Sequence, residues 1–173
     1  MTRPRVSLER LSSRHLPYVE ALTSDPAVLR FTRVPEPVPD DFAGTWLERY
    51  ETGQRDGTCA GFAALDEAGR FVGLGFAPAI DSIRGEIELG YVVTAEARGR
   101  GVAGEILRQL TTWAFGEAGA QRVILIVDVE NVASSRVAAR AGYVREGVMR
   151  SIFVKPGMRR DAELWSRLPR DPG

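Results

Sequence analysis

The stretch RGRGVAG, residues 98–104, follows the apolar run ELGYVV (88–93) and precedes EILRQLTTWAF (105–115). The run before it is typical of a strand and the run after it of a helix, so its glycines lie in a strand-to-helix connection. Small residues at a helix N-terminus let backbone N–H groups approach an anion, and the helix dipole favours negative charge there. The stretch therefore predicts a pyrophosphate site, and two kinds of cosubstrate carry a pyrophosphate.

The first kind is a dinucleotide. The spacing G-x-G-x-x-G over residues 99–104 is typical of dinucleotide-binding folds, and Asp128 follows at about the place of a ribose-binding acid. Three observations count against it. The segment TAEAR (94–98) separates the strand from the glycines, and Glu86 and Glu88 would be costly in a strand buried on both faces. The residues after Asp128, about 45, are too few for the second half of such a fold.

Apolar periodicity predicts the order β-α-α-β-β-β-α-β-α-β-β. The expected strands are 6–8, 58–65, 70–77, 85–93, 122–129, 143–148 and 162–168, and the expected helices are 12–22, 40–53, 101–118 and 131–141. Four prolines within 24–39 exclude a long helix there and predict a loop over one face. Residues 149–160 are expected to form a loop or hairpin. A right-handed crossover makes strands 86–93 and 122–129 parallel, so the sheet is mixed.

Composition bounds the class of protein. A chain of 173 residues with net charge +0 suits one domain spanning 1–173, without the basic field that nucleic acid or a membrane surface attracts. The single cysteine, Cys59, excludes an internal disulfide and fits a reducing, cytoplasmic setting. We expect Cys59 to be a buried structural thiol and His15 to be a surface residue. No His, Asp or Glu spacing indicates a metal site, and no apolar run is long enough to cross a bilayer.

Two motifs resemble those of the GNAT superfamily of acyltransferases. Arg98, Gly101 and Ala103 fill the three defined positions of its acyl-CoA-binding motif, R/Q-x-x-G-x-G/A. The segment NVASSRVAARAGY (131–143) resembles its second motif, in which an Asn opens a helix and a Gly-aromatic pair closes it. The likeness covers nearly the whole chain. It is closest to the Rim-type ribosomal-protein N-terminal acetyltransferases.

The resemblance implies a single α/β domain. Its central sheet is mixed, mostly antiparallel and twisted, has about seven strands with helices on both faces, and contains a splayed parallel strand pair. Acetyl-CoA is then the cosubstrate, with its pantetheine arm paired to the exposed strand edge. The expected coenzyme A contacts are Val92, Val93, Arg98, Gly99, Arg100, Gly101, Val102, Ala103, Gly104, Asn131 and Ser134. Asn131 is equally suited to capping the helix that it opens.

Acyl transfer to an amine needs a group that removes a proton. An α-amine has a pKa of about 8 and a lysine amine one of about 10.4, so the second needs more help. Glu88, ten residues before Arg98, is the expected base or water-positioning group, with Glu86 as the second candidate. Related enzymes often carry a helix Tyr that protonates the leaving thiolate, but Ala138 stands at that position. Ser134, with Ser135 as the neighbouring alternative, is the expected substitute donor.

The residues that bind the amine acceptor are predicted from weaker sequence signals than those that bind coenzyme A. Arg30 and Arg33 in the proline-rich segment are candidates to bind an acidic peptide terminus or a carboxylated substrate, and solvated side chains are the alternative. The chain is expected to acetylate a primary amine, either a protein N-terminal α-amine or a small molecule. The alternatives are an antibiotic- or polyamine-modifying acetyltransferase and a non-catalytic acyl-CoA-binding protein on the same fold. The sequence leaves open whether the chain forms a homodimer.

Overall fold

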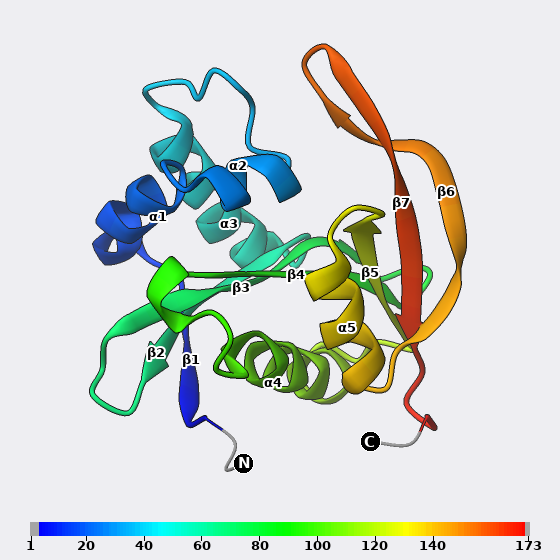
Figure 1. The fold of residues 1–173 in the computed structure, drawn as a ribbon. Helices are drawn as coiled ribbons and strands as arrows, with labels where there is room; N and C mark the ends of the chain where they lie inside the picture. Colours follow the sequence, from blue (N-terminus) through cyan, green and yellow to red (C-terminus); the bar gives the residue numbers. More distant parts are fainter. Residues whose placement is uncertain (1–3, 172–173) are drawn as a thin grey trace.

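A single mixed sheet forms the centre of the structure, a computed structural model that describes residues 4–171 (Figure 1). The strand order is β1-β2-β3-β4-β5-β7-β6. The strands are β1 (Val6–Arg10), β2 (Ala60–Asp66), β3 (Phe71–Asp81), β4 (Glu86–Val93), β5 (Arg122–Asp128), β6 (Val144–Lys155) and β7 (Met158–Arg167). The β4–β5 pair is parallel and the other five pairs are antiparallel. The predicted fold class, with seven strands and one parallel pair, is confirmed.

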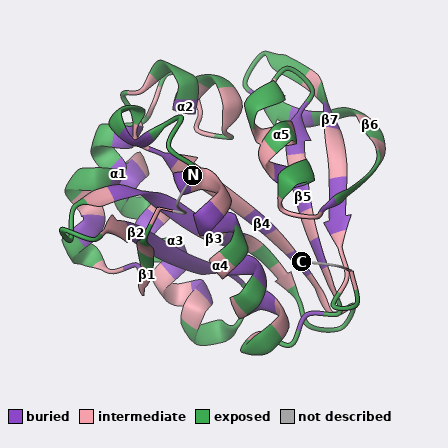
Figure 2. Cartoon of the chain, turned by 60° about the horizontal axis from the view of Figure 1, so that its bottom comes forward, coloured by how far each residue is buried: buried purple, intermediate pink, exposed green. Residues whose placement is uncertain are grey.

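Helices cover both faces of this sheet. They are η1 (Ser13–His15), α1 (Leu16–Leu22), α2 (Pro26–Phe31), α3 (Phe42–Asp56), η2 (Ala95–Ala97), α4 (Val102–Gly116) and α5 (Val132–Arg140). On one face, α4 buries Ile106, Leu107 and Leu110 completely against the strands. On the other face, α1 and α3 pack around Leu47 and Tyr50. Figure 2 shows the buried residues gathered in the strands and on the inner sides of the helices.

The parallel pair forms a fork in the sheet. Cα partners run from Glu86↔Arg122 to Glu88↔Ile124 and end there, although β4 continues to Val93 and β5 to Asp128. On its other side β4 stays paired with β3 as far as Val93. A register shift between Phe76 and Ala79 puts a bulge in β3 beside the point of divergence, and Pro78, which lacks an N–H group, lies in it. The predicted splay is thus visible in the backbone pairing.

Two elements differ from the sequence prediction, and at a third the structure decides between the two expected alternatives, a loop and a hairpin. Residues 149–160 belong to a long hairpin, with Lys155 opposite Met158 across a turn at residues 156–157. The segment expected to be a loop contains the short helix α2, whose N-cap Asp25 accepts from the N–H of Ala27 at 2.8 Å. Helix α3 continues past Gly53 to Asp56; at Gly53 a Cβ atom would lie 2.1 Å from Cys59 Sγ.

The expectation that His15 lies on the surface is wrong. Its side chain is 3% exposed, and Glu9 in β1 supplies its partner: His15 Nε2 lies 2.8 Å from Glu9 Oε1. The N–H of Ser12 donates to Nδ1 at 3.0 Å. Cys59 is buried, as expected. Within residues 4–171, no helix has the length and apolar character needed to span a membrane.

Candidate active site

A cavity of about 470 Å³ opens where β4 and β5 diverge. Its volume is in the range of small-molecule sites. Its walls come from α1, α2, α3, β3, the separated parts of β4 and β5, and the start of α5. The lining residues discussed below are Arg33, Trp46, Arg49, Tyr50, Phe76, Glu88, Tyr91, Val92, Asp128, Asn131 and Ser134. The fork therefore brings together residues that are far apart in the sequence.

The glycine-rich loop lies at the open end of β4. Gly99 and Gly101 have φ values of 74° and 81°, a backbone conformation that other residues rarely adopt. Gly101 is the N-cap of α4, so the N–H groups of Val102, Ala103 and Gly104 have no acceptor within the helix. A Cβ atom added at Gly104 would meet nothing within 4 Å, so the space beside these amides is open. The arrangement fits an anionic group such as a pyrophosphate.

The side chain of Arg98 holds this loop in place. Its Nε donates to the Val93 carbonyl at 3.1 Å, and its Nη2 lies 2.6 Å from Asp25 Oδ2 at the start of α2. Burial raises the pKa of Asp25, but hydrogen bonds from Arg98 and from the N–H groups of Ala27 and Val28 outweigh burial and leave this pKa lowered. The guanidinium thus ties the end of β4 to α2. The Arg100 side chain is exposed.

The structure separates the two carboxylates considered as bases. Glu88 lines the cavity, its side chain is 17% exposed, and its Oε1 lies 3.3 Å from Nη1 of Arg33. Glu86 lies at the closed end of the fork, where its Oε2 is 2.8 Å from Nε of Arg122. Arg30 is outside the cavity lining and pairs with Glu130 at 3.1 Å. Glu88 and Arg33 are therefore the candidates within reach of a substrate.

The start of α5 closes the other side of the fork. Asn131 caps the helix, since its side chain accepts from the N–H of Ser134 at 3.1 Å, and both residues line the cavity. The Ser135 hydroxyl donates to Glu163 at 2.7 Å. Ala138 is completely buried. Of the two serines considered, Ser134 is the one that lines the cavity.

Aromatic side chains from α3 and β3 form the wall opposite the fork. Trp46 lies with its ring centroid 4.3 Å from that of Tyr50 and 6.0 Å from that of Phe76, and all three residues line the cavity. Burial raises the pKa of Tyr50. The charge of Glu88 raises this pKa further, and the charges of Arg49 and Arg33 oppose the rise. Tyr50 is buried in the cluster beneath α3, and Trp46 and Phe76 pack against that cluster. They belong to the core and to the cavity wall at once.

Two further cavity residues had no signal in the sequence for the role they take. Tyr91 follows the end of the β4–β5 ladder, and its hydroxyl is buried. Asp128 suggested only a ribose contact; its side chain is 0% exposed and its Oδ2 lies 2.8 Å from Nε of Arg160. Both positions depend on how distant strands and helices pack around them, which sequence spacing does not reveal.

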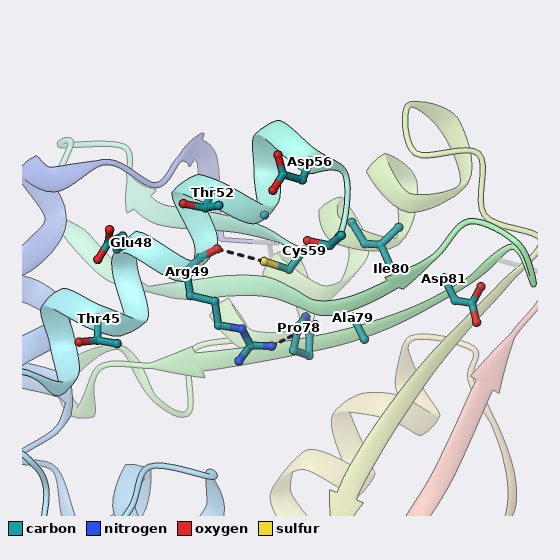
Figure 3. Close-up of a pocket in the computed structure, with 12 residues that line it drawn as sticks. Thr45, Glu48, Arg49, Thr52, Asp56, Cys59, Pro78, Ala79, Ile80 and Asp81 are labelled. Carbon is teal, nitrogen blue, oxygen red and sulfur yellow. Dashed lines mark hydrogen bonds between the residues drawn. The ribbon is translucent and has the colours of Figure 1, made fainter.

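A second hollow, of about 650 Å³, lies between α3 and the end of β3 (Figure 3). Arg49 separates it from the cavity, donating from Nη2 to the Pro78 carbonyl at 3.0 Å, and Cys59 Sγ points to the Arg49 carbonyl at 3.5 Å. Among residues 4–171, no group of three or more His, Cys, Asp or Glu side chains is placed to hold a metal ion.

The chain belongs to the acetyltransferase (GNAT) domain family, whose model matches residues 5–144. It is 33% identical over 92 residues to the Bacillus subtilis (strain 168) protein named "Putative ribosomal N-acetyltransferase YdaF", covering 53% of this chain and 50% of that protein. It is 28% identical over 120 residues to "Uncharacterized N-acetyltransferase YoaA" of the same organism, covering 69% of this chain and 59% of that protein. The matches thus span half to three-fifths of these relatives.

Solved structures share the fold over almost the whole chain. A RimL ribosomal L7/L12 α-N-protein acetyltransferase in complex with coenzyme A has a TM-score of 0.85 at 20% identity, covering 94% of this chain and 93% of that one. A spermidine N-acetyltransferase from Vibrio cholerae in complex with CoA and spermine has a TM-score of 0.84 at 20% identity, covering 96% of each chain. The expected resemblance to the GNAT superfamily and to Rim-type enzymes is confirmed.

Proposed function

We propose that this chain transfers the acetyl group of acetyl-CoA to a primary amine by direct attack within a ternary complex. The observation that carries the proposal is the cavity at the fork, whose lining follows β4 from Glu88 to Val92, toward the loop that leads into α4. Family membership supports it, and two structures that share the fold are named as coenzyme A complexes. A cytoplasmic location is part of this proposal and rests on the single, buried Cys59.

The start of α4, the free edge of β4 and the cavity residues each have a role in this proposal. The amides of residues 102–104 hold the pyrophosphate, and the unpaired edge of β4 beyond Glu88 pairs with the pantetheine amides. Acetyl-CoA supplies an activated thioester carbonyl. Glu88 accepts the proton of the incoming ammonium, directly or through a water, so that the amine nitrogen can bond to the carbonyl carbon. The C–S bond breaks with its electron pair going to sulfur, the nitrogen releases its remaining surplus proton to water, and the Ser134 hydroxyl donates a hydrogen bond to the departing sulfur.

The charges in the cavity favour an acceptor with one amine over a polyamine. Both carboxylates in the lining are already ion-paired, Glu88 with Arg33 and Asp128 with Arg160. Arg49 adds a further positive charge to the lining. A peptide N-terminus or an apolar monoamine fits this balance, whereas spermidine would need several unpaired carboxylates. Polyamine modification and acyl-CoA binding without catalysis are the alternatives that the assay below separates from the proposal.

The test is release of free thiol from acetyl-CoA in the presence of three acceptors: a peptide with a free N-terminus, the same peptide with a blocked N-terminus and one lysine, and spermidine. The free peptide should react fastest. Replacing Glu88 by Gln should lower kcat at neutral pH by about 10²-fold, the scale of general base catalysis, without weakening acetyl-CoA binding. Glu86→Gln, on the same strand, is the matched control and should keep its activity.

Thiol release with none of the acceptors, despite measurable acetyl-CoA binding, would leave the non-catalytic alternative. Faster reaction with spermidine than with the peptide would favour a polyamine acetyltransferase. If Glu88→Gln matched the wild type from pH 6 to 9, Glu88 would be only part of a polar strand face.

A further inference from the structure

The hydroxyl of Tyr91 is buried without a hydrogen-bond partner in the described part of the chain. Tyr91 lies on β4 three residues beyond Glu88, where the ladder to β5 has ended, and it lines the cavity. A buried hydroxyl without a partner costs free energy of folding. This cost is recovered if the hydroxyl forms its hydrogen bond when a ligand occupies the fork.

A second buried tyrosine shows how the fold treats a structural hydroxyl. Tyr143 Oη lies 2.7 Å from Thr111 Oγ1 on α4, a fully buried hydrogen bond. Burial raises the pKa of Tyr143 to about 12, and it raises the pKa of Tyr91 to about 12 as well. The two phenols thus share burial and differ in their partners.

Ser134 is the side chain that acts on the Tyr91 hydroxyl across the cavity that both residues line. Ser134 lies in the first turn of α5 and lines the same cavity. Its hydroxyl acts on Tyr91 by lowering the pKa that burial raises. A serine hydroxyl in a helix can otherwise turn back to a carbonyl of the preceding turn. A hydrogen bond from Tyr91 can keep the Ser134 hydroxyl from turning back to such a carbonyl.

We propose that Tyr91 is the positioning residue for Ser134. With the acyl donor in the fork, Tyr91 Oη–H donates to Ser134 Oγ, so the Ser134 hydrogen is directed at the departing sulfur. The inference rests on the proposed acetyl transfer. Donation from Tyr91 also polarises the Ser134 O–H bond, which strengthens its hydrogen bond to sulfur. Neither hydroxyl has to give up its proton, because a thiol with a pKa of about 8.5 can leave as the thiolate with the electron pair of the C–S bond.

The test compares Tyr91→Phe with Tyr143→Phe in the full-length protein. Tyr91→Phe should lower kcat by about five- to tenfold, the effect of one lost hydrogen bond in the transition state, with both KM values nearly unchanged. Its melting temperature should stay at the wild-type value or rise. Tyr143→Phe should melt at a lower temperature and keep its kcat. The double variant Tyr91→Phe/Ser134→Ala should be no slower than Ser134→Ala alone.

Several results would overturn the inference. Multiplicative losses in the double variant would show that Tyr91 does not act through Ser134. A raised KM for acetyl-CoA at unchanged kcat would mean that Tyr91 contacts the cosubstrate itself, and a loss of stability like that of Tyr143→Phe would make its role structural. An active wild type with an unaffected Tyr91→Phe removes this inference alone, whereas an inactive wild type removes the proposed acetyl transfer and the inference with it.

Discussion

Arg122 clamps the closed end of the fork at the level of single side chains. Its Nε lies 2.8 Å from Glu86 on β4, and its Nη1 and Nη2 donate to the two carboxylate oxygens of Glu146 on β6 at 2.6 and 2.7 Å. The Ser166 hydroxyl donates to Glu146 as well. The Arg122 and Ser166 hydrogen bonds lower the pKa of Glu146 from 4.5 to about 2. One arginine thus ties β4, β5 and β6 together just below the cavity.

Because of this clamp, we expect the stability of the fold to depend on pH. Since the folded-state pKa of Glu146 is depressed, its contribution is present above pH 4.5 and is lost as the pH falls toward 2. The melting temperature of Glu146→Gln should therefore fall less steeply than that of the wild type over this window. Glu67→Gln, which removes the exposed partner of Arg5, should follow the wild type. Equal slopes for Glu146→Gln and the wild type would show that the clamp adds nothing.

Single residues were predictable where the signal is local. The positions of Asn131 and Ser134 on the cavity follow from a helix start after a buried strand, and that of Glu88 from its distance to the glycine loop. His15 was misjudged because its partner, Glu9, belongs to another element. The unpaired Tyr91 hydroxyl could not be inferred at all, because it depends on how far β5 diverges from β4.

At the scale of elements, side chains of the β6–β7 hairpin bind the α2 segment, and both lie in the upper part of Figure 1. The Lys155 side chain is 3% exposed, and its Nζ donates to the Leu29 carbonyl and to Glu36. Arg160 donates to the Arg30 carbonyl at 2.5 Å while it pairs with Asp128. The hairpin and the proline-rich segment therefore form one wall of the cavity.

Replacing Lys155 by Met should loosen this wall. The Leu29 carbonyl and Glu36 lose their cationic donor, so the free energy of unfolding should fall by about 1.5–3 kcal/mol. The acceptor KM should rise while the dissociation constant of acetyl-CoA stays unchanged. Arg159→Met is the matched control, because Arg159 donates to Ser151 within the hairpin and is exposed. A weaker affinity for acetyl-CoA with an unaltered acceptor KM would place this wall at the wrong end of the site.

The two strands of the hairpin, β6 and β7, extend beyond the predicted strands 143–148 and 162–168. Register shifts between Arg145 and Gly147 and between Met149 and Phe153 interrupt the alternation from which strands are recognised. Helix α2 did carry a local signal, an Asp25 cap followed by proline at the first helical position, but the later prolines dominated the prediction. The remaining order of strands and helices followed from periodicity, because each of those elements buries one continuous face.

At the scale of the whole molecule, the site is a consequence of strand order. The crossover through α4 places its N-terminus at the open end of a parallel pair, where the divergence of β4 and β5 creates both a cavity and an unpaired strand edge. Ligands in α/β sheets bind at the carboxyl ends of strands for the same reason. In the proposed function, the start of α4 binds the pyrophosphate of acetyl-CoA.

The measurement that tests this claim most directly is calorimetric titration of Gly104→Glu with acetyl-CoA, with Gly116→Glu at the other end of α4 as control. Neither added side chain meets another atom within 4 Å of its Cβ. A glutamate in the first turn favours the helix dipole, so Gly104→Glu should be at least as stable as the wild type. It should nevertheless bind acetyl-CoA about 10²-fold more weakly or not at all, through lost amide contacts and charge repulsion. Gly116→Glu should bind normally. Wild-type affinity in folded Gly104→Glu would contradict the account.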